Sequence, residues 1–597
     1  MRGDTSEKSS STPKKRANGP TELQVTLDRD TLRQTLMMET KKTTFLPGNS
    51  TYDETPKKII QKLPAPKGCS WLVVVAAVAA SLSGLMLGYE MGLTSGVLLQ
   101  LRGLLTLSCR QQEVLVSSHL LGALLICVAG GPILDRYGRR WSLLLSAGMV
   151  VGGTVVLMVI TSLVALVFGR LIIGMGTSLS GTGACLYIAE ISPRDRRGQL
   201  VTLYEFMLVI GVMLGFGCSY VFASIPHGWT YTFGLVIPPA LLQFGVLLFL
   251  PPSPRFKVAQ GKMEQARKVL NRLRGGNKEQ VEGELRDIQS GLKVESEHRF
   301  LDLFRSKANL RSRLLTGVIL VFLQQATGQP NILSYASPLL RSVGFDSDAA
   351  ATLASTGFGV VKVVGTIPAV MLVDRMGPKS FLCAGAVAMA ISLAALGTLT
   401  LQSHTHLTSL CTSQSHTNHT LVPWEPNASF TGWDGAEASA DLPLPTEIVW
   451  TEEDLGASSQ SLGGVSLYMK WASLISLLVY VAAFSISLGP MVYVVLSEIF
   501  PMGVRGRAVS VVSAVNWATN LLISMTFLTV TERIGVSNVM FLYAAMSFVL
   551  LVFVIMCVPD TRGRSLEEIS KELAKKKHTE ATQAQERLIG SSLAQQA

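Results

Sequence analysis

Five ionisable residues interrupt stretches of sequence that are otherwise apolar: Glu90, His119, Arg170, Glu205 and Lys362. In the middle of a membrane helix a charge costs about 3 kcal/mol, so each of them needs a partner or a water-lined cavity. Counted at about 1.5 Å per residue, Glu90 and Arg170 lie at similar depth, roughly 10–17 Å from the same membrane face. A carboxylate stays ionised beside a guanidinium and takes up a proton when it swings away. This pair could therefore couple protonation to a conformational change.

Simpler roles for the same residues stay open. Glu90 and Arg170 could form a permanent structural ion pair, and protonation would then not be coupled to a conformational change. Glu205 and Lys362 could neutralise each other or contact a polar ligand, and Glu205 could itself be the titrating group. For His119 we expect a hydrogen-bonded packing role rather than a proton relay.

The helices that must position these charges follow from hydropathy. The chain has 597 residues, of which 48% are hydrophobic and 16% charged, whereas a soluble domain carries about a quarter charged residues. About 20 apolar residues are needed to cross a bilayer core of about 30 Å. Twelve stretches qualify: residues 70–101, 113–134, 141–160, 163–188, 199–222, 231–250, 314–340, 348–373, 379–401, 469–497, 508–530 and 536–558. We predict an all-α, polytopic membrane protein with twelve transmembrane helices.

The spans fall into two groups of six around a charged segment. The predicted parts are a polar N-terminal tail (1–69), a six-helix bundle (70–250), a linker with short amphipathic helices (251–313), a second six-helix bundle (314–558) and a polar C-terminal tail (559–597). The N-terminal tail is rich in Ser, Thr and Lys and is expected to be disordered. Residues 402–468 form a long loop within the second bundle.

The charges between the spans set the orientation in the membrane. Lys and Arg cluster in alternate loops and in the linker, whereas residues 402–468 contain neither. By the positive-inside rule both termini and the linker are cytoplasmic, and the loop at 402–468 faces outward. The net charge of +11 therefore marks topology and not a nucleic-acid partner.

Two motifs occur once in each half. "GGPILDRYGRR" (130–140) parallels "AVMLVDRMGPK" (369–379), and "AEISPRDRRG" (189–198) parallels "SEIFPMGVRG" (497–506). Two six-helix repeats around a midplane cavity are typical of an alternating-access transporter. Ion pairs on the cytoplasmic rim could latch the halves in one state, and recurrence in both halves favours this latch over simple anchoring of loops. The predicted cytoplasmic gate comprises Asp135, Arg136, Arg139, Arg140, Glu190, Arg197, Asp374, Arg375, Glu498 and Arg505, with Glu190 facing Arg197 and Glu498 facing Arg505.

Small residues and cysteines have structural interpretations. The glycines of spans four and five are expected to let helices approach closely; they are Gly174, Gly176, Gly181, Gly183, Gly211, Gly215 and Gly217. The cysteines have no metal-ligand spacing, so no metal is expected. Cys109 and Cys411 fall on predicted outer loops, where a disulfide could persist.

The motifs together resemble a known family. "DRYGRR", "GRLIIG", "YIAEISPRDRRG", "PPSPRF", "QQATGQPN", "SEIFP" and "PDTRG", spread over residues 70 to 570, resemble the sugar porter family of the major facilitator superfamily. "GYEMGLTSGVLL" and "TGQPNILSYAS" more closely resemble its class III facilitative glucose transporters. The resemblance implies the major facilitator fold and hexose transport, of D-glucose in the first place, in the plasma membrane or in perinuclear or other endomembrane vesicles. It also implies glycosylation of Asn418 and Asn427 in the long outer loop.

The resemblance carries a sugar site onto this sequence. Amides suit a sugar because each offers a donor and an acceptor to hydroxyl groups. Gln324 and Gln325 match the family's span-seven pair, and Asn516, Trp517 and Asn520 match its span-eleven set. Four candidate positions depart from the family pattern: Glu205 replaces a glutamine, Lys362 an asparagine and Tyr493 a tryptophan, and Asn331 is displaced by one residue.

The mode of transport stays open at this point. Proton-coupled members of the family carry an acid at the position of Glu90, with the arginine of span four nearby, so both symport and facilitated diffusion fit. A transporter-like sugar sensor, or a carrier of dehydroascorbate, urate or a polyol, is the alternative. The sequence lacks the G-x-x-x-x-G-K-[ST] loop and the HExxH motif, so neither an enzyme nor a bound cofactor is expected.

Overall fold

The computed structural model describes residues 70–193, 196–275, 278–297, 304, 310–345, 347–402, 467–500 and 504–559. Within these residues the secondary structure is helical, without a β-strand. The prediction of an all-α protein is therefore confirmed. Apart from Pro559, the predicted tails lie outside the described residues, as do Asn418, Asn427 and Cys411 in the loop at 402–468.

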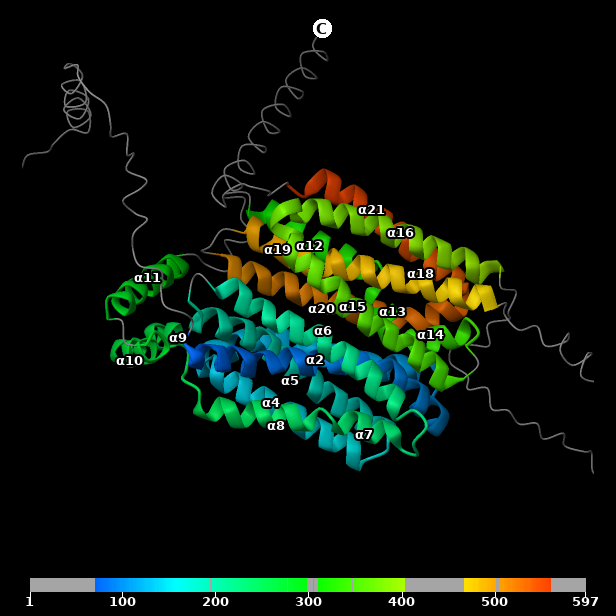
Figure 1. Cartoon of the computed structure of the whole chain (residues 1–597), viewed down its shortest axis with the longest axis horizontal. Helices are drawn as coiled ribbons and strands as arrows, with labels where there is room; N and C mark the ends of the chain where they lie inside the picture. Colours follow the sequence, from blue (N-terminus) through cyan, green and yellow to red (C-terminus); the bar gives the residue numbers. More distant parts are fainter. Residues whose placement is uncertain are drawn as a thin grey trace, which may run out of the picture. The chain divides into compact units, whose positions relative to one another are not determined.

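The first group of six spans forms the N-terminal bundle (Figure 1). Its helices are α2 (Trp71–Leu105), α3 (Cys109–Tyr137), α4 (Arg139–Val159), α5 (Leu163–Ile191), α6 (Arg197–Val221), α7 (Gly228–Gly234) and α8 (Ile237–Phe249). The linker follows with α9 (Pro254–Ala259), α10 (Met263–Leu273) and α11 (Lys278–Glu297). The N-terminal bundle starts and ends within a few residues of the predicted boundaries.

The second group forms the C-terminal bundle. Its helices are α12 (Leu310–Ala326), α13 (Gln329–Ser334), α14 (Ala336–Ser342), α15 (Asp348–Met376), α16 (Pro378–Gln402), α18 (Leu467–Ile486), α19 (Leu488–Ile499), α20 (Arg505–Ile534) and α21 (Val536–Cys557). Eleven helical stretches in the described residues are long and apolar enough to cross a membrane, with α7–α8 and α18–α19 each counted as one stretch. Span seven consists of α12, α13 and α14 and completes the predicted twelve.

Proline and glycine explain the breaks that hydropathy did not reveal. In span seven Gly328 adopts φ 89°, and Pro330 stands in the first turn of α13. A left-handed glycine ends a helix readily, and proline favours the start of the next because it has no N–H to leave unpaired. In span six a proline, Pro238, likewise stands in the first turn after the break, but the residues at that break, Leu235 and Val236, keep right-handed backbone angles. Broken helices place backbone carbonyls at membrane depth, where side chains or a ligand must satisfy them.

Glycines bring α2 and α6 into backbone contact. Gly84, Gly88 and Gly92 recur every four residues along one face of α2, and a Cβ on any of them would lie 1.9–2.4 Å from a backbone oxygen of α6. From the opposite side, Gly211 and Gly215 of α6 meet backbone oxygens of α2. These two confirm the expected close approach. Gly217 does not, because a Cβ there would meet nothing within 4 Å.

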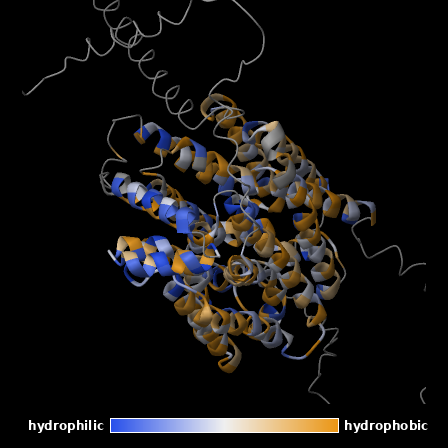
Figure 2. Ribbon diagram, turned by 60° about the vertical axis from the view of Figure 1, so that its left-hand side comes forward, coloured by the Kyte–Doolittle hydropathy of each residue, from blue (hydrophilic) through white to orange (hydrophobic). Residues whose placement is uncertain are grey.

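The linker packs against one end of the N-terminal bundle. Arg274 donates to both carboxylate oxygens of Glu284, at 2.6 and 2.8 Å, and to the carbonyl of Ile191 at the end of α5. On the exposed face, hydrogen bonds to Glu282 and the charge of Glu264 raise the pKa of Arg267. Figure 2 shows hydrophilic residues concentrated on the linker helices and hydrophobic residues along the bundle helices. We call this end of the molecule the linker end and the opposite end the distal end.

Candidate functional site

An amide cluster joins α12 to α19 and α20 in the C-terminal bundle. Gln325 donates to Oδ1 of Asn516 at 2.5 Å, and Gln324 donates to the carbonyl of Leu488 at 2.8 Å. This carbonyl lies in the first turn of α19, directly after the break of span ten at Ser487. The structure therefore brings together the span-seven and span-eleven amides that the resemblance assigned to the sugar.

Asn331 belongs to the same region. The break after α12 turns its side chain toward α20 and α21, where it donates to the carbonyl of Ile523 at 3.1 Å and to the hydroxyl of Tyr543 at 2.7 Å. Nearby Tyr335 donates to the carbonyl of Ser524 at 3.3 Å. Side chains of span seven thus bind two consecutive carbonyls in the middle of α20.

Four amide oxygens of these candidates are buried without a hydrogen-bond donor in the described structure. They are Oε1 of Gln324, Oε1 of Gln325, Oδ1 of Asn331 and Oδ1 of Asn520. A buried acceptor without a donor is costly, so the site fits a neutral ligand that brings several hydroxyl donors. Trp517, which follows Asn516 in the sequence of α20, is half-buried. Tyr493 on α19 is 45% exposed.

Glu205 and Lys362 come from different bundles. Glu205 lies on α6 and Lys362 on α15, two helices that pack together across the halves. Each acts on the other electrostatically, but they do not approach closely enough to form an ion pair in the described structure. The ammonium of Lys362 lies 5.6 Å from the ring centre of Phe484. Tyr493 is also within electrostatic range of Glu205, which places three of the four departures from the family pattern in one region.

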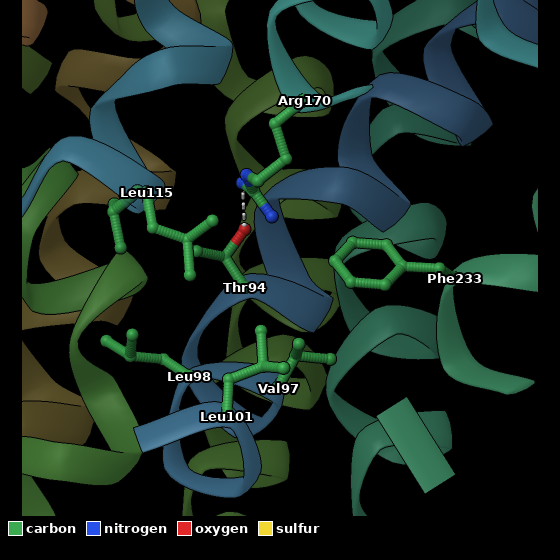
Figure 3. A pocket seen from close by; sticks show the side chains of 8 residues that line it. Thr94, Val97, Leu98, Leu101, Leu115, Arg170 and Phe233 are labelled. Atoms are coloured by element: carbon green, nitrogen blue, oxygen red, sulfur yellow. Dashed lines mark hydrogen bonds between the residues drawn. The ribbon is translucent and has the colours of Figure 1, made fainter. Parts of the chain in front are cut away.

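Glu90 and Arg170 lie near each other without forming an ion pair. Arg170 donates to Oγ1 of Thr94 at 2.9 Å (Figure 3). Thr94 in turn donates to the backbone carbonyl of Glu90 at 2.6 Å. Figure 3 shows the guanidinium of Arg170 above Thr94, with the ring of Phe233 to one side; the guanidinium carbon is 5.9 Å from the ring centre. Arg170 is thus attached to the helix of Glu90 through Thr94.

Glu90 is buried, with 1% of its surface exposed, and neither carboxylate oxygen has a hydrogen-bond partner among the described residues. Arg170 remains within electrostatic range. A charged carboxylate in such surroundings is unfavourable unless a partner approaches, whereas the protonated acid is accommodated more easily. The geometry does not support a permanent ion pair with Arg170.

His119 packs against α5. Its Nε2 lies 3.2 Å from Oγ1 of Thr177, and its backbone carbonyl lies so close to Gly174 that a Cβ there would be 2.0 Å away. The expected packing role fits this position.

At the linker end, the predicted partner of Glu190 is wrong. Glu190 forms an ion pair with Arg139 at 3.1 Å and accepts a hydrogen bond from Ser253, whereas Arg197 is exposed. Arg139 also lies 3.5 Å from Asp135. The reason is helix packing: α4 and α5 lie side by side, so the start of α4 faces the end of α5.

The remaining gate candidates that the structure describes lie in different parts of the linker end and do not form one cluster with Glu190. Arg140 donates to the carbonyl of Leu248 at 2.6 Å and joins α4 to α8, and Arg136 is exposed above the ring of Tyr137. Glu498 is half-buried near the end of α19. The side chains of Asp374, Arg375 and Arg505 lie outside the described part of the chain.

Contacts between the bundles at the distal end were not anticipated from the sequence. Glu113 of α3 accepts hydrogen bonds from the backbone N–H and the hydroxyl of Thr529 on α20, at 2.7 and 2.8 Å. Ser95 lies 3.2 Å from Ser337. Glu113 is the first residue of the predicted span 113–134, and its position in the sequence does not reveal a partner on α20. Cys109, at the start of the same helix, is disulfide-bonded; Cys411, which the sequence offered as its partner, lies outside the described residues.

The comparisons with known proteins agree with this geometry. The family model described as "Sugar (and other) transporter" matches residues 75–415 and 458–573. The chain belongs to this family. A zebrafish (Danio rerio) protein named solute carrier family 2, facilitated glucose transporter member 12, is 53% identical over 552 residues, which cover 86% of this chain and 89% of the relative. The human protein of the same name is 48% identical, over 86% of this chain and 87% of the relative.

A solved structure gives the fold independently. The xylose transporter XylE from E. coli, in a partially occluded inward open conformation, matches with a TM-score of 0.62 and 26% identity, over 83% of this chain and 100% of that chain. The same protein is described elsewhere as a proton:xylose symporter of the major facilitator superfamily. The predicted major facilitator fold and the resemblance to sugar porters are confirmed.

Proposed function

We propose that this protein transports a hexose such as D-glucose by alternating access between its two bundles. The observation that carries the proposal is the set of four unpaired amide oxygens on Gln324, Gln325, Asn331 and Asn520. Hydroxyl groups of a pyranose would donate to these oxygens, while an aromatic ring such as that of Trp517 would cover an apolar sugar face. The names of the relatives, which refer to glucose and xylose, support the same class of substrate.

Uptake of radiolabelled 2-deoxyglucose in oocytes tests this proposal. Gln325→Leu removes an acceptor and also the donor that binds Asn516. Loss of one neutral hydrogen bond costs about 0.5–1.5 kcal/mol, so uptake per transporter should fall by about three- to tenfold, mainly through KM. Gln280→Leu on the exposed face of the linker serves as the control for the same substitution. Normal uptake by Gln325→Leu would count against the site.

The proposed orientation places the linker end in the cytoplasm with both termini. The distribution of Lys and Arg supports it. The bundles touch at the distal end through Glu113 and Thr529, so the outer side is closed in this conformation. An inward-facing state agrees with the inward open conformation of the matching XylE structure. The plasma membrane or cycling vesicles would then be the site of action.

Proton coupling at Glu90 is the second part of the proposal. With the outer side closed, Arg170 is bound to Thr94, and no described residue donates a hydrogen bond to the carboxylate of Glu90. A proton on Glu90 stabilises this arrangement. Once the proton leaves, the ionised carboxylate attracts Arg170 away from Thr94, and the helices α2 and α5 that carry them shift relative to each other. The substrate and the proton would thereby cross in the same cycle.

Sugar-evoked current in voltage-clamped oocytes separates symport from facilitated diffusion. Wild type should give an inward current that grows as the outside pH falls. Glu90→Gln, which keeps the shape of the neutral acid, should lose the current while sugar exchange survives. Glu279→Gln on the exposed surface of α11 is the matched control. Sugar uptake by wild type without current or pH dependence would make the protein a facilitator and reduce Glu90 to a structural role.

A further inference from the structure

Within the described residues, the two bundles touch at the distal end through three polar contacts that differ in strength. Ser95 and Ser337 form a neutral contact at 3.2 Å. Arg102 lies 3.6 Å from Asp348, which is 52% exposed and also pairs with Arg341 of its own bundle at 3.2 Å. Because Asp348 is half exposed and divided between two arginines, this ion pair is screened by solvent and contributes little. The contact of Glu113 with Thr529 differs, because it is buried and both carboxylate oxygens take part.

Glu113 is 4% exposed and accepts two short hydrogen bonds from one residue, 416 positions away. Hydrogen bonds to an ionised acceptor are about twice as strong as neutral ones. The two donors also fix the direction of the carboxylate, since one is a backbone N–H and the other a hydroxyl. Among the distal contacts of the described residues, it is the one in which both oxygens of a buried carboxylate are bound by the opposite bundle.

The backbone of α20 is arranged to receive this carboxylate. Thr529 lies inside the helix, where an N–H ordinarily donates to the carbonyl four residues earlier. Here it reaches Oε1 of Glu113 at 2.7 Å. Six and five residues before it, the carbonyls of Ile523 and Ser524 accept from Asn331 and Tyr335. Residues 523–529 of α20 thus exchange hydrogen bonds with side chains from α3, α13 and the break between α13 and α14.

We propose that Glu113 is the latch residue of the distal gate: its carboxylate holds the gate closed by binding the N–H and hydroxyl of Thr529. Because α3 and α20 belong to different bundles, both hydrogen bonds must break whenever the distal end opens. Water then replaces Thr529 at the carboxylate. The latch therefore sets the balance between the two conformations of the transport cycle, and it does so at a distance from the amide cluster that would bind sugar.

The same contact connects the gate with the proposed sugar and proton sites. Tyr335 lies within electrostatic range of both Glu113 and Arg170, and its hydroxyl binds α20 at Ser524. Asn331 binds the same stretch of α20 at Ile523. Movement of α20 on release of Glu113 would therefore reach residues beside both sites.

Cysteine accessibility in the full-length protein at the oocyte surface tests the latch. Ser337 is 0% exposed in the closed gate, so Ser337→Cys should react with a membrane-impermeant thiol reagent only while the gate is open. In this background, Glu113→Ala and Thr529→Val should each raise the labelling rate by about tenfold or more, the population change expected for loss of a hydrogen bond to a charged group. Glu532→Gln, an exposed carboxylate three residues beyond Thr529, should leave the rate unchanged.

The inference rests on the proposed function in one respect: the proposed orientation places the distal end on the outer side of the membrane. Gly103→Cys checks this, because Gly103 is exposed at the distal end of α2 and a Cβ there meets nothing within 4 Å. If external reagent does not label Gly103→Cys, the proposed orientation fails. If Gly103→Cys is labelled and Thr529→Val leaves the rate at Ser337→Cys unchanged or slower, the latch is refuted. Thr529→Val preserves side-chain shape, so it decides the question even if Glu113→Ala does not reach the surface.

Discussion

The substitution Gly88→Ala probes the contact that fixes Glu90 in place. A Cβ at Gly88 would lie 1.9 Å from the backbone oxygen of Leu208, and real Cβ atoms are essentially never closer than 3.0 Å to another heavy atom. The two helices must therefore separate by at least 3.0 − 1.9 = 1.1 Å at this point. A backbone oxygen cannot rotate away as a side chain could, so α2 itself has to move.

The expected cost follows from two opposing effects. Overpacking costs typically about 1–3 kcal/mol, and the upper end applies because backbone meets backbone. Replacing Gly by Ala in a helix recovers about 1 kcal/mol. The net destabilisation should be about 2 kcal/mol, with a fall of several degrees in melting temperature by fluorescence-detected thermal unfolding in detergent. The displacement also shifts Glu90, two residues further along α2, relative to Thr94 and Arg170, so sugar-evoked current should fall.

A matched control lies on the partner helix. Gly217→Ala makes the same chemical change on α6, where a Cβ meets nothing within 4 Å, and it should leave the melting temperature unchanged or raise it. If Gly88→Ala is as stable as Gly217→Ala, then α2 and α6 move apart to accommodate the added Cβ without a measurable loss of stability. The glycine contacts would then not be what holds Glu90 in position.

Two further predictions concern charges. Exchanging Glu205→Lys with Lys362→Glu in one chain should restore part of the uptake that either single reversal abolishes, because the two groups interact electrostatically; additive losses in a double-mutant cycle would show that they act separately. Arg139→Ala removes the ion-pair partner of Glu190, whose side chain is 6% exposed, and leaving a buried charge unpaired should destabilise the protein by about 3 kcal/mol. Arg197→Ala, at an exposed residue, should change stability by less than about 0.5 kcal/mol. If the two variants lose the same amount in melting temperature, the result would instead favour the pairing of Glu190 with Arg197 that the sequence suggested.

The sequence predicted the spans well because bilayer crossing depends on a simple quantity. Each predicted span overlaps a helix or a broken pair or triplet of helices, and α16 (378–402) differs from its prediction by one residue at either end. The breaks were missed because hydropathy does not register them. In span seven, the dipeptide Gly328-Gln329 followed by Pro330 was the available indication, and it is the break there that turns Asn331 toward α20.

Partners were harder to predict than positions. The seven-residue spacing between Glu190 and Arg197 suggested a local pair, yet Glu190 pairs with Arg139, because the packing of α4 on α5 brings these two together. Spacing along one segment cannot reveal which neighbouring helix lies opposite. The same limit applies to Glu113, whose partner Thr529 lies 416 residues away. The amides of spans seven and eleven were placed by resemblance, and two of them, Gln325 and Asn516, do meet.

Two carboxylates on neighbouring helices, Glu90 and Glu113, therefore differ in what they can do during a transport cycle. Both are at most 4% exposed. Glu113 has hydrogen-bond donors for both oxygens while the gate is closed, whereas Glu90 has none among the described residues, so a proton on Glu90 is favoured there. When the distal end opens, Glu113 loses its donors on Thr529 and water reaches the interface between the bundles. A group that keeps its charge suits a latch, and a group that must gain and lose a proton suits coupling; the hydrogen bonds around each carboxylate assign the two roles.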